Sequence, residues 1–112
     1  MPSRYEPCGL NQIYSLRYGT IPIVRKTGGL ADTVEPFSED FSTGNGIVFD
    51  LMSGEAIYNA VNQADIFWNS IPSKIQEIRK RCMDMRFDWD SSAESYIEVY
   101  KRALTKENYY AQ

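Results

Sequence analysis

The chain has 112 residues, of which 43% are hydrophobic and 24% charged, a composition typical of one small globular domain. Its net charge of −3 excludes a broad basic surface for nucleic acid, and no apolar run is long enough for a membrane span. Without histidine, a Ser-His or Cys-His nucleophile pair cannot be built from this chain alone. We expect a reduced, cytoplasmic chain with no metal site, and a Cys8–Cys82 disulfide is the alternative.

Helix and strand patterns alternate in the first half of the chain. Apolar residues at helical spacing, followed by Gly19 as a C-cap, predict a short helix with Ile13 and Leu16 facing inward. Two short apolar runs predict buried strands, and a basic loop and an irregular stretch separate them. In chain order, the expected elements are a helix over 11–18, a strand over 21–24, a loop over 25–30, irregular chain over 31–45 and a strand over 46–49.

Three helices are predicted in the second half, each opened by a serine that can act as the N-cap: Ser53, Ser73 and Ser91. Each helix has apolar residues at helical spacing, which predicts one buried face. The predicted faces are Ile57, Val61, Ala64 and Trp68; then Ile75, Ile78, Cys82 and Met85; then Ala93, Tyr96, Ile97, Tyr100 and Leu104. We also expect Trp89 in the core, and a polar tail over 105–112 that frays.

This alternation indicates the α/β class with parallel strand pairing. Two parallel strands cannot cover both faces and both edges of a sheet, so the pattern predicts part of a larger Rossmann-like domain.

Residues 4–12 predict a loop that runs into the N-terminus of a helix. The first N–H groups of a helix have no internal partners and favour an anion. Glu6, just before this end, is an acceptor suited to sugar hydroxyls, and Gly9 allows the main chain to approach a ligand closely. A second loop, with Lys26, Thr27 and the Gly28–Gly29 pair, follows a predicted strand and suits binding at the carboxyl edge of a sheet.

Residues 2–12 closely resemble the C-terminal nucleotide-sugar motif of bacterial glycogen synthases and plant starch synthases. Residues 26–30 are similar to the second motif of the same family, and the resemblance continues at 32–34, 46–49 and 87–102. It covers roughly residues 1–104, and residues 105–112 form the tail beyond it.

The resemblance implies the C-terminal part of a two-domain GT-B glycosyltransferase, including helices that cross back toward the other domain. The implied reaction transfers glucose from ADP-glucose to the 4-hydroxyl of an α-1,4-glucan with retention of configuration, and needs neither cofactor nor metal. The implied partners are ADP-glucose or ADP, the glucan and the N-terminal glycosyltransferase domain, with no nucleic acid and no membrane.

Glu6 is implied to be the catalytic residue, holding hydroxyls of the transferred glucose. The implied substrate-binding residues are Cys8, Gly9, Leu10, Asn11, Lys26, Thr27, Gly28 and Gly29. Those of the first loop would act mainly through their backbone. The alternatives are a solvated carboxylate for Glu6, a small buried hydrophobe for Cys8 and an ordinary N-cap for Asn11.

Two departures from the wider superfamily refine the resemblance. Many retaining transferases have a second glutamate where this chain has Tyr14. Glycogen and starch synthases also lack that glutamate, so its absence supports the narrower family. The family's N-terminal Lys-x-Gly-Gly loop and its Arg and Lys pair are not in this sequence. Since those cations stabilise the leaving diphosphate, we expect the chain alone to be inactive. A different nucleotide-sugar transferase and a non-catalytic glucan- or partner-binding fragment are the alternatives.

Overall fold

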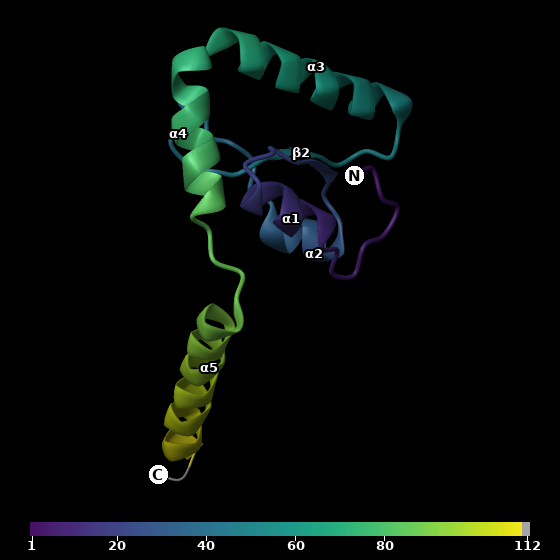
Figure 1. The fold of residues 1–112 in the computed structure, drawn as a ribbon. Helices are drawn as coiled ribbons and strands as arrows, with labels where there is room; N and C mark the ends of the chain where they lie inside the picture. Colours follow the sequence, from purple (N-terminus) through teal and green to yellow (C-terminus); the bar gives the residue numbers. More distant parts are fainter. Residues whose placement is uncertain (111–112) are drawn as a thin grey trace.

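The computed structural model describes the backbone of residues 1–110 and the side-chain surroundings through residue 105. Helices and two short strands alternate along it (Figure 1). The elements are α1 (Asn11–Arg17), β1 (Ile23–Arg25), α2 (Gly28–Thr33), β2 (Ile47–Phe49), α3 (Gly54–Ser70), α4 (Pro72–Met83) and α5 (Trp89–Tyr110).

β1 and β2 form a parallel pair, with Ile23 opposite Ile47 and Arg25 opposite Phe49, so the prediction of an α/β fold with parallel pairing is confirmed. Helix α3 lies over one side of the sheet, and α1 and α2 lie on the other (Figure 1). Both strands end at the same edge, where the Lys26 N–H donates to the Phe49 carbonyl at 2.7 Å. The loops that leave this edge therefore start close together.

Met1 extends the sheet on the free side of β1. Its amino group donates to the Ile23 carbonyl at 2.6 Å, and its own carbonyl accepts from the Arg25 N–H at 3.1 Å. Met1 thus pairs with the side of β1 that faces away from β2, without forming a strand of its own. The chain that follows Met1 therefore begins at the carboxyl edge of β1.

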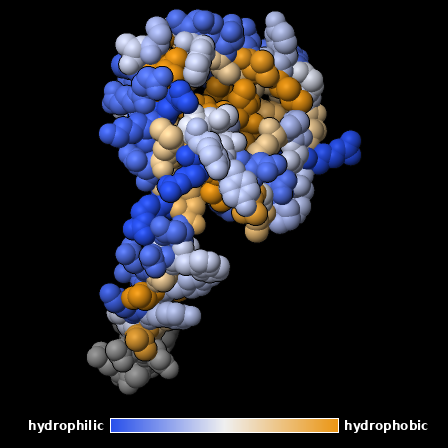
Figure 2. Space-filling model, viewed as in Figure 1, coloured by the Kyte–Doolittle hydropathy of each residue, from blue (hydrophilic) through white to orange (hydrophobic). Residues whose placement is uncertain are grey.

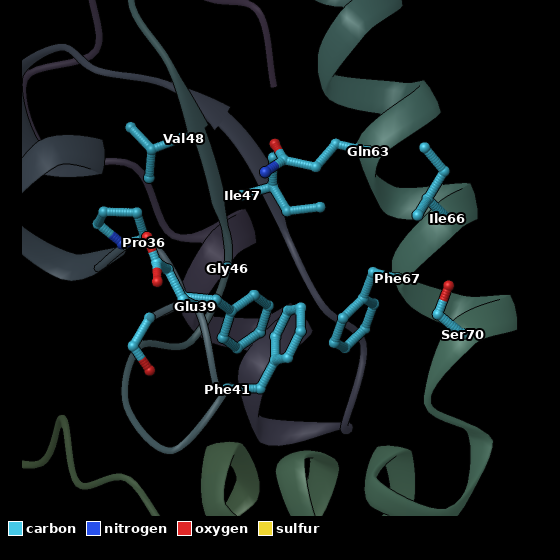
Figure 3. Close-up of a pocket in the computed structure, with 12 residues that line it drawn as sticks. Pro36, Glu39, Phe41, Gly46, Ile47, Val48, Gln63, Ile66, Phe67 and Ser70 are labelled. Atoms are coloured by element: carbon cyan, nitrogen blue, oxygen red, sulfur yellow. The ribbon is translucent and has the colours of Figure 1, made fainter.

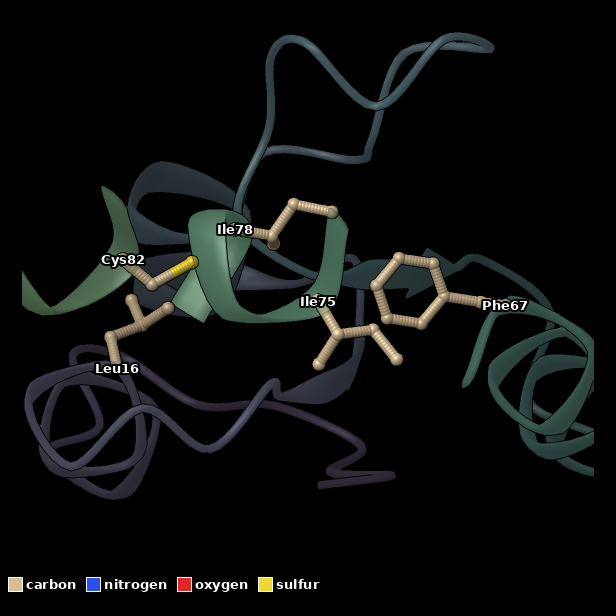
Figure 4. Packing of buried hydrophobic residues seen from close by; sticks show 5 residues of the cluster. All are labelled: Leu16, Phe67, Ile75, Ile78 and Cys82. Carbon is tan, nitrogen blue, oxygen red and sulfur yellow. The ribbon is translucent and has the colours of Figure 1, made fainter. Parts of the chain in front are cut away.

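Two apolar clusters hold the layers together. One lies where α1, α3 and α4 meet and contains Leu16, Phe67, Ile75, Ile78 and Cys82 (Figure 4). The other joins β1 to α2 and contains Val24, Leu30 and Val34. The inward position of Leu16 and the burial of Ile75, Ile78 and Cys82 on α4 are thus confirmed. Ile13 is only partly buried, as is Met85, which lies beyond the end of α4. On α3 the predicted face was wrong, since Ala60 and Phe67 are buried whereas Val61 and Trp68 are half exposed.

Of the three predicted serine caps only Ser53 is confirmed, and the predicted start of α1 at residue 11 is confirmed as well. The Ser53 hydroxyl accepts from the Ala56 N–H at 3.1 Å. Helix α4 begins two residues earlier than the Ser73 cap predicted, because Pro72 occupies the first helical position, where its missing N–H needs no partner.

Helix α5 starts at Trp89, and the carboxylate of Asp88, rather than Ser91, serves its first turn by accepting from the Ser91 N–H at 2.9 Å.

Helix α5 projects away from the remainder of the molecule (Figure 1). The radius of gyration is 17.5 Å, whereas a compact domain of this length has about 13 Å. The predicted core stripe is therefore wrong for the described chain, in which Trp89 is 85% exposed and Tyr96 and Tyr100 are also exposed. Residues 111–112 of the predicted tail lie outside the described residues, and the boundary at residue 104 stays a prediction.

Helix α2 was not predicted, and a loop and irregular chain were expected in its place. The Gly28–Gly29 pair has low helix propensity, which the burial of Leu30 overrides. The first strand also lies two residues later than expected, because Pro22 has no N–H to donate to a ladder.

The glycine pair allows residues 1–10, which we call the entry loop, to pack on α2. The Gly29 N–H donates to the Glu6 carbonyl at 2.9 Å and to the Pro7 carbonyl at 3.1 Å. A Cβ atom on Gly28 would overlap the Glu6 carbonyl oxygen, and one on Gly29 would overlap the Cys8 carbonyl oxygen. Both positions therefore need the absence of a side chain.

We predict that Gly29→Ala lowers the free energy of unfolding by about 1–3 kcal/mol, the usual penalty for overpacking. Backbone surrounds the added methyl group and cannot move aside as a flexible side chain would. The matched control is Gly54→Ala, since a Cβ there meets nothing within 4 Å. Urea unfolding of both variants measures the difference, and equal midpoints would contradict the packing described.

Candidate functional site

The two loops that the sequence singled out meet at the carboxyl edge of the sheet. The entry loop lies against the start of α2, where Gly29 binds the Glu6 and Pro7 carbonyls. Arg25, at the end of β1, donates to the Arg4 carbonyl at 2.8 Å and to the Asp50 carbonyl at 2.9 Å. Its guanidinium therefore ties the entry loop to the end of β2.

The Glu6 side chain is half buried at this junction. Its only hydrogen bond among the described residues is a long one, in which the Ser3 hydroxyl donates at 3.4 Å. No lysine or arginine in that part of the chain forms an ion pair with it. Its acceptor oxygens are consequently available to a ligand.

The carbonyl groups of the loop point inward. Those of Glu6 and Pro7 accept from Gly29, and those of Cys8 and Gly9 each accept from the Gln12 side-chain amide at 3.0 Å. A trans peptide directs its N–H opposite to its carbonyl. The N–H groups that follow these carbonyls therefore face away from the interior.

Of the further candidates in the first loop, Cys8, Leu10 and Asn11 are exposed. The interpretation of Cys8 as a small buried hydrophobe is therefore wrong. The N-cap of α1 is Leu10, and Asn11 is the first helical residue, so Asn11 is not the cap either. Cys82 is the buried cysteine; burial raises the pKa of its thiol, and both thiols are free.

In the second loop, Lys26 is exposed and forms no ion pair among the described residues. Thr27 is the N-cap residue of α2, but its side chain makes no capping hydrogen bond. The structure thus brings the glycine pair against the entry loop and places Lys26 and Thr27 directly before it. The binding roles of all these residues remain predictions.

Two residues that sequence reasoning did not select take part in this junction. Gln12 on α1 is fully buried, and its Nε2 lies 3.1 Å from the hydroxyl of Thr33 at the end of α2. The Thr33 hydroxyl in turn donates to the Gly29 carbonyl at 2.6 Å. A glutamine among the inward-facing positions of an apolar helix was the available signal.

A cavity of about 410 Å³ lies elsewhere, between the chain after Val34, β2 and α3 (Figure 3). Phe37, Phe41 and Phe67 line it, and the rings of Phe37 and Phe67 stack at 5.2 Å. Asp40 fixes the turn beside it, and hydrogen bonds from Ser38 and Ser42 lower the pKa of its carboxyl group to about 2. None of the predicted site residues lines this cavity.

Neither a metal-binding cluster nor a membrane-spanning helix is present among the described residues. No group of three or more histidine, cysteine, aspartate or glutamate side chains is placed to hold a metal ion. In the same part of the chain, no helix combines the length and apolar character needed to cross a membrane.

Comparison with known proteins gives a consistent result. No family model matches. The glycogen synthase of Treponema denticola is 52% identical over 106 residues, which is 95% of this chain and 22% of that protein. The glycogen synthase of Fervidobacterium nodosum is 49% identical over the same shares. The chain therefore spans about a fifth of the length of these relatives.

The fold has a similar counterpart among solved structures. The catalytic domain of starch synthase IV from Arabidopsis thaliana, bound to ADP and acarbose, matches with a TM-score of 0.77 and 36% identity. The match covers 93% of this chain and 22% of that one. The chain is therefore homologous to the glycogen and starch synthases, and it corresponds to the C-terminal part of their GT-B catalytic domain.

Proposed function

We propose that this chain supplies one half of an active site that transfers glucose from ADP-glucose to the 4-hydroxyl of an α-1,4-glucan with retention. The observation that carries the proposal is the contact between the two loops, in which Gly29 holds the backbone of Glu6 and Pro7. The homology to glycogen synthases supports it, as does a structural relative whose description includes ADP and acarbose.

In this proposal the donor diphosphate and ribose lie over the two loops. The backbone of Cys8, Gly9 and Leu10 offers outward N–H groups, and the Asn11 side chain is exposed beside them. Lys26 provides a cation, and Thr27, Gly28 and Gly29 line the other side. No cofactor or metal is proposed, because protein cations carry the phosphate charge.

Glu6 is proposed to hold hydroxyls of the transferred glucose. Its carboxylate is half buried and has no cationic partner among the described residues, so its acceptors are not already neutralised. Fixing the sugar orients its anomeric carbon toward the acceptor, and such positioning lowers the barrier by removing rotational freedom beforehand.

The opposing phosphate loop and the Arg and Lys pair are proposed to come from the remainder of the catalytic domain. The relatives are several times longer than this chain, which leaves room for that part. A different nucleotide-sugar transferase is less well supported, because Tyr14 stands where many of those enzymes have glutamate. Cytoplasmic location stays a prediction.

We predict that Glu6→Ala lowers kcat about tenfold to hundredfold, because a charged hydrogen-bond acceptor is worth about 1.5–3 kcal/mol. The host is a chimeric synthase in which residues 1–112 replace the matching segment of the Treponema denticola relative. Binding of ADP should change less than about twofold, since Glu6 is proposed to contact sugar rather than diphosphate. Glu77→Ala, on the exposed side of α4, is the matched control. Near-normal turnover by Glu6→Ala would remove this residue from the site.

We predict that the 112-residue chain alone binds ADP with Kd of about 1 mM, close to −4 kcal/mol, and transfers no glucose. Half a site attracts a diphosphate but cannot exclude water or position an acceptor. Adding the N-terminal part of a relative, in trans or by fusion, should restore incorporation of labelled glucose from ADP-glucose into glycogen. Robust transfer by the chain alone would overturn the assignment of half a site.

A further inference from the structure

The side chain of Gln12 is completely buried. Burying an amide is unfavourable unless it forms hydrogen bonds, so its contacts have to account for its presence. Its Nε2 lies 3.0 Å from the Cys8 carbonyl, 3.0 Å from the Gly9 carbonyl and 3.1 Å from the Thr33 hydroxyl. One amide thus contacts both the entry loop and α2.

These contacts close a ring of hydrogen bonds around the loop junction. Gln12 donates to the hydroxyl of Thr33, which donates to the Gly29 carbonyl at 2.6 Å. The Gly29 N–H donates back to the Glu6 and Pro7 carbonyls. All four successive carbonyls from Glu6 to Gly9 therefore face donors inside the molecule, where the two hydrogens of the Gln12 amide are shared among three acceptors and the single Gly29 N–H hydrogen between two.

From this ring we propose that Gln12 is a positioning residue for the nucleotide diphosphate, acting through the loop backbone; the inference rests on the proposed function. With the carbonyls held inward, the N–H groups of Cys8, Gly9 and Leu10 face the opposite way. Within residues 1–110 none of the three donates a hydrogen bond. Donors preset for a phosphate oxygen need no reorganisation when the ligand arrives.

The other half of the amide contributes no hydrogen bond. Its Oε1 is buried and has no hydrogen-bond partner in the described part of the chain. This oxygen faces Gly9, where an added Cβ would approach to 2.8 Å. An unpaired buried acceptor is unfavourable, and an apolar side chain of similar size would relieve it. Gln12→Leu should therefore remove the positioning contacts and still allow the domain to fold.

The test uses the chimeric synthase described above, with Gln12→Leu, Thr33→Val and the double variant. Gln76→Leu is the matched control, because Gln76 is exposed on α4. Calorimetry gives Kd for ADP, and steady-state assays give kcat and separate KM values for ADP-glucose and glycogen. Gln12→Leu should raise the Kd for ADP and the KM for ADP-glucose about tenfold and leave the KM for glycogen unchanged.

Thr33→Val should give a smaller rise of the same two constants, because it removes one link of the ring. The double variant should resemble Gln12→Leu rather than the product of the two effects, since both side chains belong to one network. Thr33→Ser keeps the hydroxyl and should retain the wild-type constants. Gln76→Leu should match wild type.

A purely structural role predicts another pattern. Partial unfolding reduces the active fraction, so apparent kcat falls while both KM values stay constant, and that result overturns the inference. If Gln12→Leu does not fold, the comparison of Thr33→Val with Thr33→Ser tests the inference instead. Equal values of the Kd for ADP and of the KM for ADP-glucose in these two variants would overturn the inference as well. Failure of the wild-type chimera to bind ADP or transfer glucose would instead overturn the proposed function.

Discussion

The hydrogen bonds from the Gly29 N–H to the Glu6 and Pro7 carbonyls are the constraint on which the candidate site depends. They are possible only because Gly28 and Gly29 have no side chains, so that two segments of backbone touch. This contact brings a half-buried carboxylate to the edge where both strands end. The other hydrogen bonds at the junction, including the one from Arg25 to the Arg4 carbonyl, stabilise an arrangement of the two loops that the glycine pair already allows.

The apolar cores lie away from this junction and support it indirectly. The cluster around Leu16 fixes α1 against α4, and the cluster around Leu30 fixes α2 against β1. Both helices that frame the entry loop are therefore anchored by their inner faces, although each has fewer than eight residues. Such short helices are stable only through tertiary packing. The chain thus separates the parts that supply stability from those that are proposed to face a ligand.

Local pattern was sufficient for much of the fold. The parallel strands, the inward Leu16, the main buried residues of α4 and the Ser53 cap follow from periodicity and capping chemistry, and all are confirmed. Helix α2 escaped prediction because propensity argues against a helix that begins with two glycines. The apolar stripe of α5 has the spacing of a buried face, but its residues are exposed. Burial depends on which other elements cover a face, and the sequence of the helix alone does not give this.

The residues of the candidate site likewise fall into those that the sequence indicated and those that only the structure reveals. The motif residues were found from their resemblance, and the structure adds that their loops touch. Gln12 and Thr33 were missed, because their hydrogen bond joins positions 21 apart and the one available signal was a single glutamine on the inward side of a short helix. Side-chain bonds to backbone carbonyls depend on the path of the loop, which only the folded chain defines.

The contrast between the two cysteines has a practical consequence. Cys8 is exposed on the entry loop beside Glu6, whereas Cys82 is buried in the core, where burial raises the pKa of its thiol. The thiolate is the nucleophile that attacks an alkylating reagent, and the reagent needs access to it, so such reagents discriminate strongly between these two thiols. The folded chain thus carries one addressable position for a fluorophore or spin label, on the loop where nucleotide is proposed to bind.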